Sequence, residues 1–423
     1  MIKVGIVGVG TVGSSVVKIL QENADIITAR SGKKIVPVMG VVKNLSKKRD
    51  IDIPLSDNVD DVLQNDDIDV VVELMGGVDD AFAVVKKALL SKKAVVTANK
   101  ALLAYHRFEL RDIAGDTPIG YEASVAGGIP IIKALREGLS ANHIQSIKGI
   151  MNGTCNYILT KMMNEKATFE NVLKEAQALG YAEADPTFDV GGFDAAHKLL
   201  ILASIAYGID VKPEDILIEG IENIDNEDIF FAKEFGYNIK LLTIAKKSGN
   251  QVQLRVHPAL VPMSQMIAKV DGVMNGISVV GDRVGETMYY GPGAGGNATA
   301  SAVISDLIDI ARSGKKSPML GFKKPLENCN LTLMNSDDIE TKYYIRIKVA
   351  DKIGVLSQIS QVLGAQGISI GSFLQKPDVQ DESNAILLFS THTCKEKDIQ
   401  IALKQIGSLV FVKEKPAMIR IES

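Results

Sequence analysis

The amino-terminal segment MIKVGIVGVGTVG, residues 1–13, decides the fold of the first third of the chain. Its apolar, largely β-branched residues 2–7 predict a buried strand, and residues 12–23 predict the helix that follows. A G-x-G-x-x-G motif joins the two. Its first glycine permits a tight turn, its second lets the backbone approach a pyrophosphate, and its third lets helix and strand pack closely. We therefore predict a dinucleotide-binding loop made by Gly8, Gly10, Thr11, Val12 and Gly13.

The segments after this motif alternate between short strands and helices. Strands are predicted at 35–42, 70–74 and 94–97, with helices between them such as 81–90. This alternation indicates α/β architecture with a parallel, doubly wound sheet of the Rossmann type, which we place at residues 1–125. The motif thus ends a strand and opens a helix, as a dinucleotide site requires. A glycine-rich turn without a ligand is the alternative, and this context disfavours it.

From about residue 120 onward the pattern becomes α+β. A glycine-rich loop at 125–130 precedes an apolar helix. Further strands are predicted at 144–150, 253–261 and 276–280, and long helices at 168–179 and 193–207. This pattern is typical of a substrate-binding and dimerisation domain, which we place at residues 126–318. Its last helix, near 299–312, is expected to pack back on the nucleotide domain.

The C-terminal part begins with a polar stretch. Residues 311–340 are enriched in Lys, Ser, Asn, Pro and Asp, and we interpret 319–340 as a linker. The elements after it are predicted, in order, as strand 343–350, helix 353–365, strands 368–374 and 384–390, helix 395–406 and strand 409–413. This βαββαβ order is that of a ferredoxin-like domain, at residues 341–423.

Composition and charge exclude several classes of protein. The 423 residues suffice for two or three domains, and 46% hydrophobic residues are ordinary for a globular chain. A net charge of -4 and the absence of Trp argue against a nucleic-acid-binding surface. Cys155, Cys329 and Cys394 form no CxxC pair, which argues against a disulfide scaffold or zinc site and fits a reducing compartment. The most apolar stretch, 198–209, is too short to span a bilayer. We therefore expect a soluble, cytoplasmic protein without nucleic-acid or membrane partners.

The end of the second predicted strand indicates which dinucleotide binds. Sites for NAD usually present Asp or Glu there to the ribose hydroxyls. Here the sequence is GVVKN at 40–44, without an acid, and Lys47, Lys48 and Arg49 follow. These cations favour the 2′-phosphate of NADP over NAD, with Lys43 as a contact. A solvated charge run is the alternative.

Two segments carry candidate catalytic chemistry. Thr97 and Lys100 follow a buried strand, and ligands of doubly wound sheets bind at C-terminal strand ends. We therefore place both beside the cofactor, although position alone fits a solvated loop lysine equally well. In the segment 180–198, four carboxylates precede or begin an apolar helix. Asp194 and Lys198 in that segment are four residues apart and share one helix face, which is expected to border a cleft. A desolvated Lys there suits acid–base chemistry.

The longer run A-x3-G-Y-A-x2-D-P-x2-D-V-x-G-x-D-x3-K, from Ala176 to Lys198, resembles the signature of the homoserine dehydrogenases at every fixed position. The resemblance covers most of residues 1–320, through the segments 8–13, 97–102, 121–130, 152–154 and 291–295. One departure is Asn297-Ala298, where the family pattern has a Pro next to the Thr.

This resemblance implies reversible, NAD(P)-dependent hydride transfer between L-homoserine and L-aspartate 4-semialdehyde, in threonine, methionine and isoleucine biosynthesis. Lys198 corresponds to the proton donor and acceptor, Lys100 to a second active-site lysine, and Asp194 to a residue that orients Lys198 and substrate. Which lysine dominates proton transfer stays open. The implied substrate contacts are Gly153, Thr154, Tyr181, Glu183 and Asp189.

The resemblance further implies a monovalent cation, Na+, held largely by backbone carbonyls, which suit a hard cation. Its implied ligands are Glu122, Val125, Gly127 and Ile129. We expect a homodimer or homotetramer.

The C-terminal βαββαβ unit resembles the ACT domain, a sensor of small molecules in amino-acid enzymes. The stretch 351–356, DKIGVL, matches its strand–helix turn, and Ser369 stands where Asn is commonest. Gly354 would let the carboxylate of an amino acid approach N–H groups at the helix start. The resemblance implies feedback regulation with L-threonine as the first effector to test, and a domain kept for assembly is the alternative. If residues 1–320 hold the whole catalytic core, removing 330–423 leaves an active, effector-insensitive enzyme.

Two other functions fit the same scaffold. One is a different amino-acid dehydrogenase, which would need another acid–base residue than the 180–198 signature supplies. The other is a non-catalytic sensor of nucleotide and amino acid. The presence of Lys100, Asp194 and Lys198 argues against it.

Overall fold

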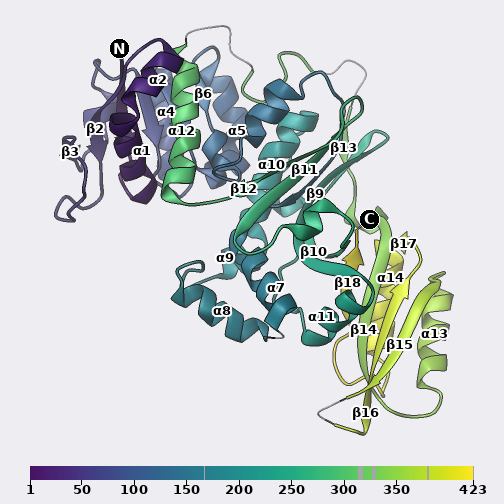
Figure 1. The fold of residues 1–423 in the computed structure, drawn as a ribbon. Helices are drawn as coiled ribbons and strands as arrows, with labels where there is room; N and C mark the ends of the chain where they lie inside the picture. Colours follow the sequence, from purple (N-terminus) through teal and green to yellow (C-terminus); the bar gives the residue numbers. More distant parts are fainter. Residues whose placement is uncertain (166, 313–317, 326–329, 379–380, 423) are drawn as a thin grey trace. The chain divides into compact units, whose positions relative to one another are not determined.

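The structure is a computed structural model that describes residues 1–165, 167–312, 318–325, 330–378 and 381–422. The chain divides into two compact units (Figure 1). The first comprises residues 1–153, 194–215 and 273–331, and the second comprises 154–193, 216–272 and 332–423.

A six-stranded parallel sheet forms the nucleotide domain of the first unit, in the order β3-β2-β1-β4-β5-β6. Its strands are β1 (Ile2–Val7), β2 (Ile35–Val41), β3 (Leu55–Ser56), β4 (Val70–Glu73), β5 (Ala94–Thr97) and β6 (Ile119–Gly120). The helices between them are α1 (Thr11–Glu22), α2 (Ala24–Ser31), α3 (Asp60–Leu63), α4 (Asp79–Leu90) and α5 (Lys100–Ala114). The strand order reverses at β1, as in a Rossmann fold, so the predicted fold class is confirmed for this domain.

Helix α12 (Gly296–Ala311) completes this domain from a distant part of the sequence, and Figure 1 shows it beside α1. Val303 and Leu307 of α12 are fully buried in the same core as Val4 of β1 and Val16 of α1. The helix begins at Gly296, where an added Cβ would lie 2.8 Å from the Ser15 hydroxyl of α1. The absence of a side chain there lets the two helices approach closely.

The rest of the first unit holds an antiparallel group of strands and one deeply buried helix. The strands are β7 (Ile144–Ile150), β11 (Met274–Gly281) and β12 (Gly285–Pro292), in the order β12-β11-β7. The short helical segments are η1 (Glu122–Ser124), α6 (Ile131–Lys133), the π-helical turn η2 (Ala134–Gly138) and η3 (Pro213–Asp215). Helix α10 (Phe193–Tyr207) is buried along nearly its whole length, which explains why its sequence has almost no polar face.

The second unit contains the segments on either side of α10. Its helices are α7 (Gly153–Glu165), α8 (Phe169–Ala178), α9 (Thr187–Val190), α11 (Asn226–Glu234) and η4 (Met266–Lys269). Its long hairpin consists of β9 (Tyr237–Ser248) and β10 (Gln251–Pro262), and the short strand β8 (Leu217–Ile218) pairs with β10.

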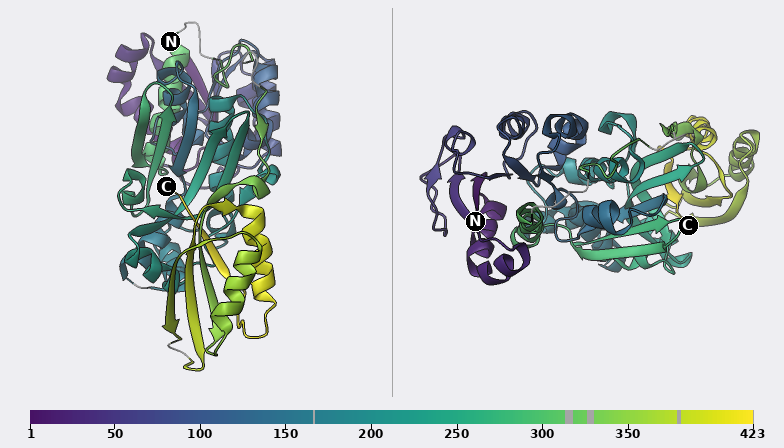
Figure 2. Two further views of the ribbon diagram at one scale, coloured as in Figure 1. Left: turned by 90° about the vertical axis from the view of Figure 1, so that its right-hand side faces the viewer. Right: turned by 90° about the horizontal axis from the view of Figure 1, so that it is seen from above.

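The C-terminal domain of this unit is a four-stranded sheet in the order β18-β14-β16-β15. Its elements are β14 (Glu340–Ala350), α13 (Val355–Ala365), β15 (Ile370–Pro377), β16 (Asn384–Thr391), β17 (Cys394–Lys395), α14 (Glu396–Gly407) and β18 (Ala417–Ile421). Figure 2 shows both helices on one face of the sheet, where Ile359 and Ile399 are buried. The predicted βαββαβ order is confirmed, so this part of the fold class holds.

The predicted strand at 409–413 is reduced to one isolated antiparallel bridge, in which Val412 pairs with Val349 of β14. Helix α14 ends only at Gly407, and the chain needs the following residues to return from the helical layer to the sheet. Val410 is fully exposed, and the last strand begins after Pro416. Because a β-branched run looks like a strand wherever it falls, pattern alone placed this strand one segment too early.

Strand β18 is paired on both of its edges within the second unit. It pairs antiparallel with β14, and Ala259 and Leu260 of β10 pair in parallel with Arg420 and Ile421. In the predicted linker, β13 (Thr332–Leu333) also pairs with β10 and η5 (Ser336–Asp338) forms a turn. Residues 326–329, including Cys329, lie outside the described residues. The C-terminal domain is therefore held to the β9–β10 hairpin by backbone pairing.

Buried charges reinforce this junction. Arg420 is fully buried and makes paired hydrogen bonds to Glu219 and to Glu396 of α14, at 2.6–3.0 Å. Asp228 of α11 accepts hydrogen bonds from the Tyr344 hydroxyl and Arg346 at 2.8 Å each. No helix within the described ranges is both long and apolar enough to cross a membrane.

Candidate active site

Lys100 lies at the start of α5, directly after the C-terminal end of β5. Asn99 caps this helix, because its side-chain oxygen accepts a hydrogen bond from the Leu102 amide at 3.0 Å. The side-chain amide nitrogen of Asn99 donates to the Gly77 carbonyl at 2.7 Å, which connects the N-cap to the loop after β4. Lys100 is thereby presented from a fixed helix start at the carboxyl edge of the parallel sheet.

Asp194 connects this lysine to a second one on α10. One of its carboxylate oxygens lies 3.0 Å from the Lys100 ammonium, and the other lies 2.7 Å from the Lys198 ammonium. The Asn152 amide also donates to Asp194 at 2.9 Å, and Lys198 donates to the Met151 carbonyl at 2.6 Å. The structure thus brings together three residues that the sequence analysis took from two distant segments.

Burial differs between the two lysines. The Lys198 side chain is 11% exposed and that of Lys100 is 36% exposed, so Lys198 lies inside and Lys100 borders solvent. Burial acts to raise the pKa of the Asp194 carboxyl, but the neighbouring Lys198 and Lys100 ammonium groups outweigh it and hold that pKa well below its ordinary value. Asp194 is therefore an ionised carboxylate shared by two cations.

His197 follows Asp194 on α10 and packs against α5. Its ring packs edge-on against Tyr105 of α5, with ring centroids 5.7 Å apart. Burial lowers the pKa of His197, which favours the neutral imidazole.

The glycine motif has the geometry that a pyrophosphate site needs. A Cβ on Gly8 would lie 2.5 Å from the Leu74 carbonyl oxygen, and one on Gly13 would lie 2.5 Å from the Gly8 carbonyl oxygen. Gly10, in contrast, has nothing within 4 Å of the position of a Cβ. The first and third glycines are thus required by packing, and the second leaves the start of α1 open to a ligand.

The cationic segment after β2 contains one residue whose contacts the sequence analysis missed. Lys43 is exposed directly after β2, and Arg49 folds back toward the glycine motif. The Arg49 guanidinium donates to the Val9 carbonyl at 2.9 Å and to the Asn44 carbonyl at 3.0 Å. Arg49 therefore fixes the loop that carries Lys43. The cluster of cations was visible in the sequence, but this contact was not.

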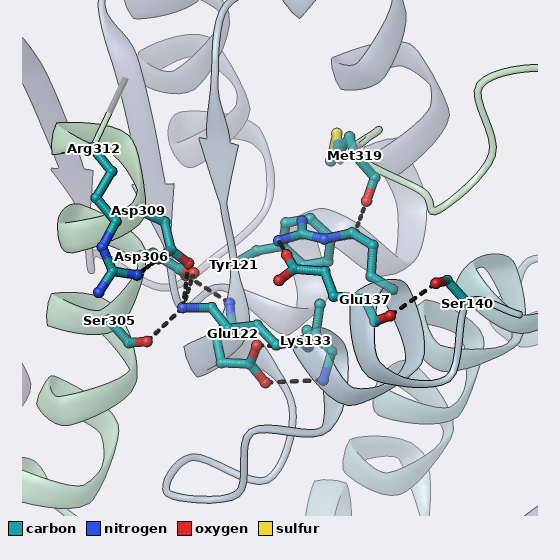
Figure 3. Close-up of polar contacts among 12 residues, drawn as sticks. Tyr121, Glu122, Lys133, Glu137, Ser140, Ser305, Asp306, Asp309, Arg312 and Met319 are labelled. Atoms are coloured by element: carbon teal, nitrogen blue, oxygen red, sulfur yellow. Dashed lines mark hydrogen bonds and ion pairs between the residues drawn. The ribbon is translucent and has the colours of Figure 1, made fainter. Parts of the chain in front are cut away.

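Glu122 is buried in a cluster of charged residues beside α12 (Figure 3). Its two carboxylate oxygens accept hydrogen bonds from the amides of Ile132 and Lys133 at 2.9 Å each, and its own amide donates to Asp306 at 2.8 Å. Burial, and then the charge of Asp306, raises the pKa of Glu122 to about 7. Gly127 has a positive φ of 32° in the loop that follows. The part of the chain that the structure describes holds no group of three or more His, Cys, Asp or Glu side chains arranged for a metal.

The predicted substrate contacts lie mostly in the second unit. The Thr154 hydroxyl donates to the Tyr181 carbonyl at 2.5 Å, which fixes the start of the signature loop against α7. Glu183 is exposed on that loop, and Asp189 is half-buried in the short helix α9. Gly153 lies at the start of α7, where a Cβ would approach the Val273 carbonyl to 2.8 Å. Their role toward substrate stays a prediction.

Glu73 is a functional candidate that sequence reasoning missed. It ends β4, is fully buried, and accepts hydrogen bonds from the Met75 amide and the Thr97 hydroxyl. A signal was present, since an acidic residue at the carboxyl end of the apolar run VVVE at 70–73 is unusual.

These features define a class of protein. A doubly wound sheet with an open glycine loop, and a lysine–aspartate–lysine cluster at its carboxyl edge, belongs to an oxidoreductase that uses a nicotinamide dinucleotide. The chain belongs to the homoserine dehydrogenase family. It matches the family described as homoserine dehydrogenase over residues 130–308, the homoserine dehydrogenase NAD binding domain over 8–118, and the ACT domain over 343–411.

Individual relatives agree with this assignment. A homoserine dehydrogenase of Helicobacter pylori is 55% identical over 422 residues, covering 100% of this chain and 99% of its own. A crystal structure of a homoserine dehydrogenase from Thiobacillus denitrificans has a TM-score of 0.94 at 44% identity, and the match covers 100% of this chain and 98% of that one. A hyperthermophilic archaeal homoserine dehydrogenase, solved in complex with NADPH, has a TM-score of 0.63 at 27% identity. That match covers 73% of this chain and 97% of the archaeal one.

Proposed function

We propose that the chain catalyses the reversible oxidation of L-homoserine to L-aspartate 4-semialdehyde with a nicotinamide dinucleotide. The observation that carries this proposal is the Asp194 carboxylate shared by Lys100 and Lys198 at the sheet edge that also holds the glycine loop. The nicotinamide ring, when bound, accepts the hydride from the carbinol carbon of the substrate. The hydroxyl proton goes to a basic group of the protein, which leaves the aldehyde.

The two lysines are suited to different parts of this reaction. The Lys198 ammonium uses two of its three N–H donors on Asp194 and the Met151 carbonyl, which leaves the third for a substrate oxygen. In the reductive direction that donor would stabilise and then protonate the developing alkoxide. Lys100, more exposed, would bind the substrate from the solvent side, and Asp194 would hold both lysines in place.

The test is an assay for homoserine-dependent reduction of NADP+ and NAD+ by the purified chain, with L-aspartate and L-threonine as control substrates. Reduction with homoserine alone is the expected result. Reduction with another amino acid would instead favour a different dehydrogenase on this scaffold.

NADP is proposed as the preferred nucleotide, with contacts from the glycine motif, Thr97, Lys100 and Lys43. The absence of an acid after β2, the exposed Lys43 and the anchoring of its loop by Arg49 support this choice. The archaeal relative solved with NADPH is consistent with it. Substrate contacts are proposed for Gly153, Thr154, Tyr181, Glu183 and Asp189, of which the two carboxylates would bind the substrate ammonium.

A sodium ion is proposed at Glu122 and the carbonyls of Val125, Gly127 and Ile129. Its support is chemical: Glu122 and Asp306 are neighbouring buried acids, and a cation beside Glu122 would offset the burial of its charge. Thermal unfolding in sodium chloride and in choline chloride tests this. Stabilisation by sodium that is lost in Glu122→Gln is the expected result.

Regulation is proposed for the ACT domain. Gly354 has a positive φ of 89° at the N-terminal end of α13, and its surroundings are open. The backbone N–H groups of that helix can therefore donate hydrogen bonds to a carboxylate. An amino-acid effector, first L-threonine, would bind there and lower activity in a cytoplasmic homodimer or homotetramer. Calorimetry against a panel of amino acids tests the effector, and sedimentation of the purified chain tests the assembly.

A further inference from the structure

Glu73 carries its carboxyl group in a fully buried position. One of its oxygens accepts a hydrogen bond from the Met75 amide at 2.7 Å, and the other accepts one from the Thr97 hydroxyl at 2.6 Å. The Thr97 oxygen itself accepts a hydrogen bond from the Asn99 amide at 3.0 Å, so its own hydrogen is directed to Glu73. Both carboxylate oxygens therefore act as acceptors, as they do in the charged form.

No cation in the described part of the chain pairs with this buried carboxyl group. Among the described residues, Glu73 makes no ion pair, and burial raises its pKa while only hydrogen-bond donors act to lower it. A carboxylate buried without a cation is normally unfavourable, because lost hydration is not repaid by a partner charge. A ligand that brings positive charge would supply such a partner.

The position of Glu73 indicates which ligand this is. In the sheet, Glu73 lies in register between Val7 of β1 and Thr97 of β5. The glycine loop follows Val7. Shortly after Thr97, Lys100 begins α5, with Asn99 as the N-cap of that helix. A dinucleotide whose pyrophosphate rests on the glycine loop, and whose reactive ring reaches the lysines, must therefore cross the strand end that holds Glu73.

The lysine cluster alone would repel an oxidised nicotinamide ring. Lys100 and Lys198 both contact the Asp194 carboxylate, so an approaching ring meets two ammonium groups at this edge. The oxidised ring carries a positive charge, and the reduced ring is neutral. A second negative group near the ring is needed if the oxidised form is to bind well.

We propose that Glu73 supplies this charge and makes the site discriminate in favour of the oxidised nucleotide. The inference rests on the nicotinamide site of the proposed function. When the substrate carbinol transfers its hydride, the ring becomes neutral and its attraction to Glu73 is lost, which favours release of the reduced form. An enzyme leaves the equilibrium of the reaction in solution unchanged. Tighter binding of the oxidised nucleotide is therefore offset by an equal shift in the equilibrium between bound reactants and bound products.

The experiment measures nucleotide binding to the full chain, without substrate. NADP+, NADPH, NAD+ and NADH are each titrated by calorimetry into the wild type, Glu73→Gln and Glu73→Met. Both substitutions remove the charge at nearly constant size. For whichever nucleotide the wild type binds, the affinity for the oxidised form is expected to fall about tenfold more than that for the reduced form, as for one charge acting over several ångströms of protein.

Two control variants separate charge from packing. Thr97→Val removes a hydrogen bond to Glu73 but keeps the charge, so it should change both affinities together. Asp79→Asn neutralises an exposed carboxylate at the start of α4 and should change neither.

The outcomes are distinct. A ratio of oxidised to reduced affinity that stays at the wild-type value in either neutral variant, with that variant folded by circular dichroism, overturns the inference. An equal loss of both affinities also overturns it, because Glu73 would then only shape the loop. If the wild type binds none of the four nucleotides, the proposed function itself has failed.

Discussion

Two clusters of buried charge in this molecule differ in how completely their hydrogen-bond donors are used. Around Arg420, one guanidinium meets two carboxylates, and each of its nitrogens donates to Glu219 or Glu396. Around Asp194, one carboxylate meets two ammonium groups, and one of them, Lys100, is partly open to solvent. The first arrangement is nearly saturated, because four of the five N–H donors of the fully buried Arg420 are used. In the second, the Lys198 ammonium uses two of its three N–H donors and keeps one for a ligand.

This comparison predicts that substitutions in the two clusters fail in different ways. A residue of the cluster around Asp194 should affect turnover far more than folding. A residue of the cluster around Arg420 should affect folding far more than turnover.

Lys198→Ala gives the largest expected effect on activity. Loss of a positioned acid–base group reduces kcat by about 10²–10⁴-fold, while the affinity for nucleotide should stay close to that of the wild type. Steady-state kinetics together with nucleotide titration measure both. Lys161→Ala, which removes a lysine paired with Glu165 and Glu175 outside the cluster, is the matched control. Near-normal turnover in folded Lys198→Ala protein would show that another residue transfers the proton.

Arg420→Ala gives the largest expected effect on stability. Removing one partner of a buried set leaves Glu219 and Glu396 unpaired, which should lower the free energy of unfolding by about 3–5 kcal/mol. Arg312→Ala is the control, because that side chain is half exposed and its pair with Asp309 is worth about 0–1 kcal/mol. Chemical denaturation measures both. Equal losses of unfolding free energy in the two variants would show that the buried Arg420 cluster matters no more for folding than an exposed ion pair.

The same reasoning changes the expectation for removal of residues 330–423. That deletion takes β18 from β10 and leaves Asp228 without Arg346 and Tyr344. We now expect a destabilised, aggregating protein instead of an active enzyme without regulation. Gly354→Asp is a gentler test of regulation, because it should block an effector carboxylate and leave the junction intact.

Glu122→Gln should change how stability depends on pH. The folded pKa of Glu122 is raised from 4.5 to about 7, so the folded protein binds this proton more tightly than the unfolded chain does. The stabilisation is present below the unfolded pKa and is lost as pH rises toward the folded one, by on the order of 2–3 kcal/mol. Denaturation at several pH values, without sodium, should show a flatter profile for the variant. An unchanged slope would assign the titration to another group.

Lys43→Asp has the smallest expected effect. It places an acid where NAD sites carry one and removes a contact for the 2′-phosphate. The ratio of kcat/KM for NADP to that for NAD should fall by about tenfold, the equivalent of one charge-assisted contact. Lys48→Ala, in the same exposed segment, is the control. If the ratio does not move, the cations after β2 are only a solvated surface.

The sequence predicted those parts of the fold that depend on local pattern. The four longer strands of the nucleotide sheet, β1, β2, β4 and β5, are short, apolar and β-branched, and α10 is largely apolar after Lys198, so these elements were found. Asp194 and Lys198 were paired correctly because helical spacing alone brings them together. The same local reasoning overestimated 409–413, where only Val412 bridges to β14 and the strand itself begins later.

Contacts between distant segments gave no local signal. Arg420 and Glu219 are 201 residues apart, and nothing in either neighbourhood indicates the pair. Glu73 and Thr97 meet because adjacent parallel strands end in register, which becomes visible only once the strand order is known. The polar composition of 319–340 suggested a tether, yet a strand in that range pairs with β10.

The dual pairing of β18 has a consequence for the time course of folding. The edge of β10 that pairs with β18 stays unpaired during folding until β18 docks. These two strands lie far apart in the sequence, and contacts of such long range form slowly. Until then β10 presents an open strand edge, which can pair with the same edge of another molecule. Refolding should therefore be limited by docking of the C-terminal domain, with yields that fall as protein concentration rises.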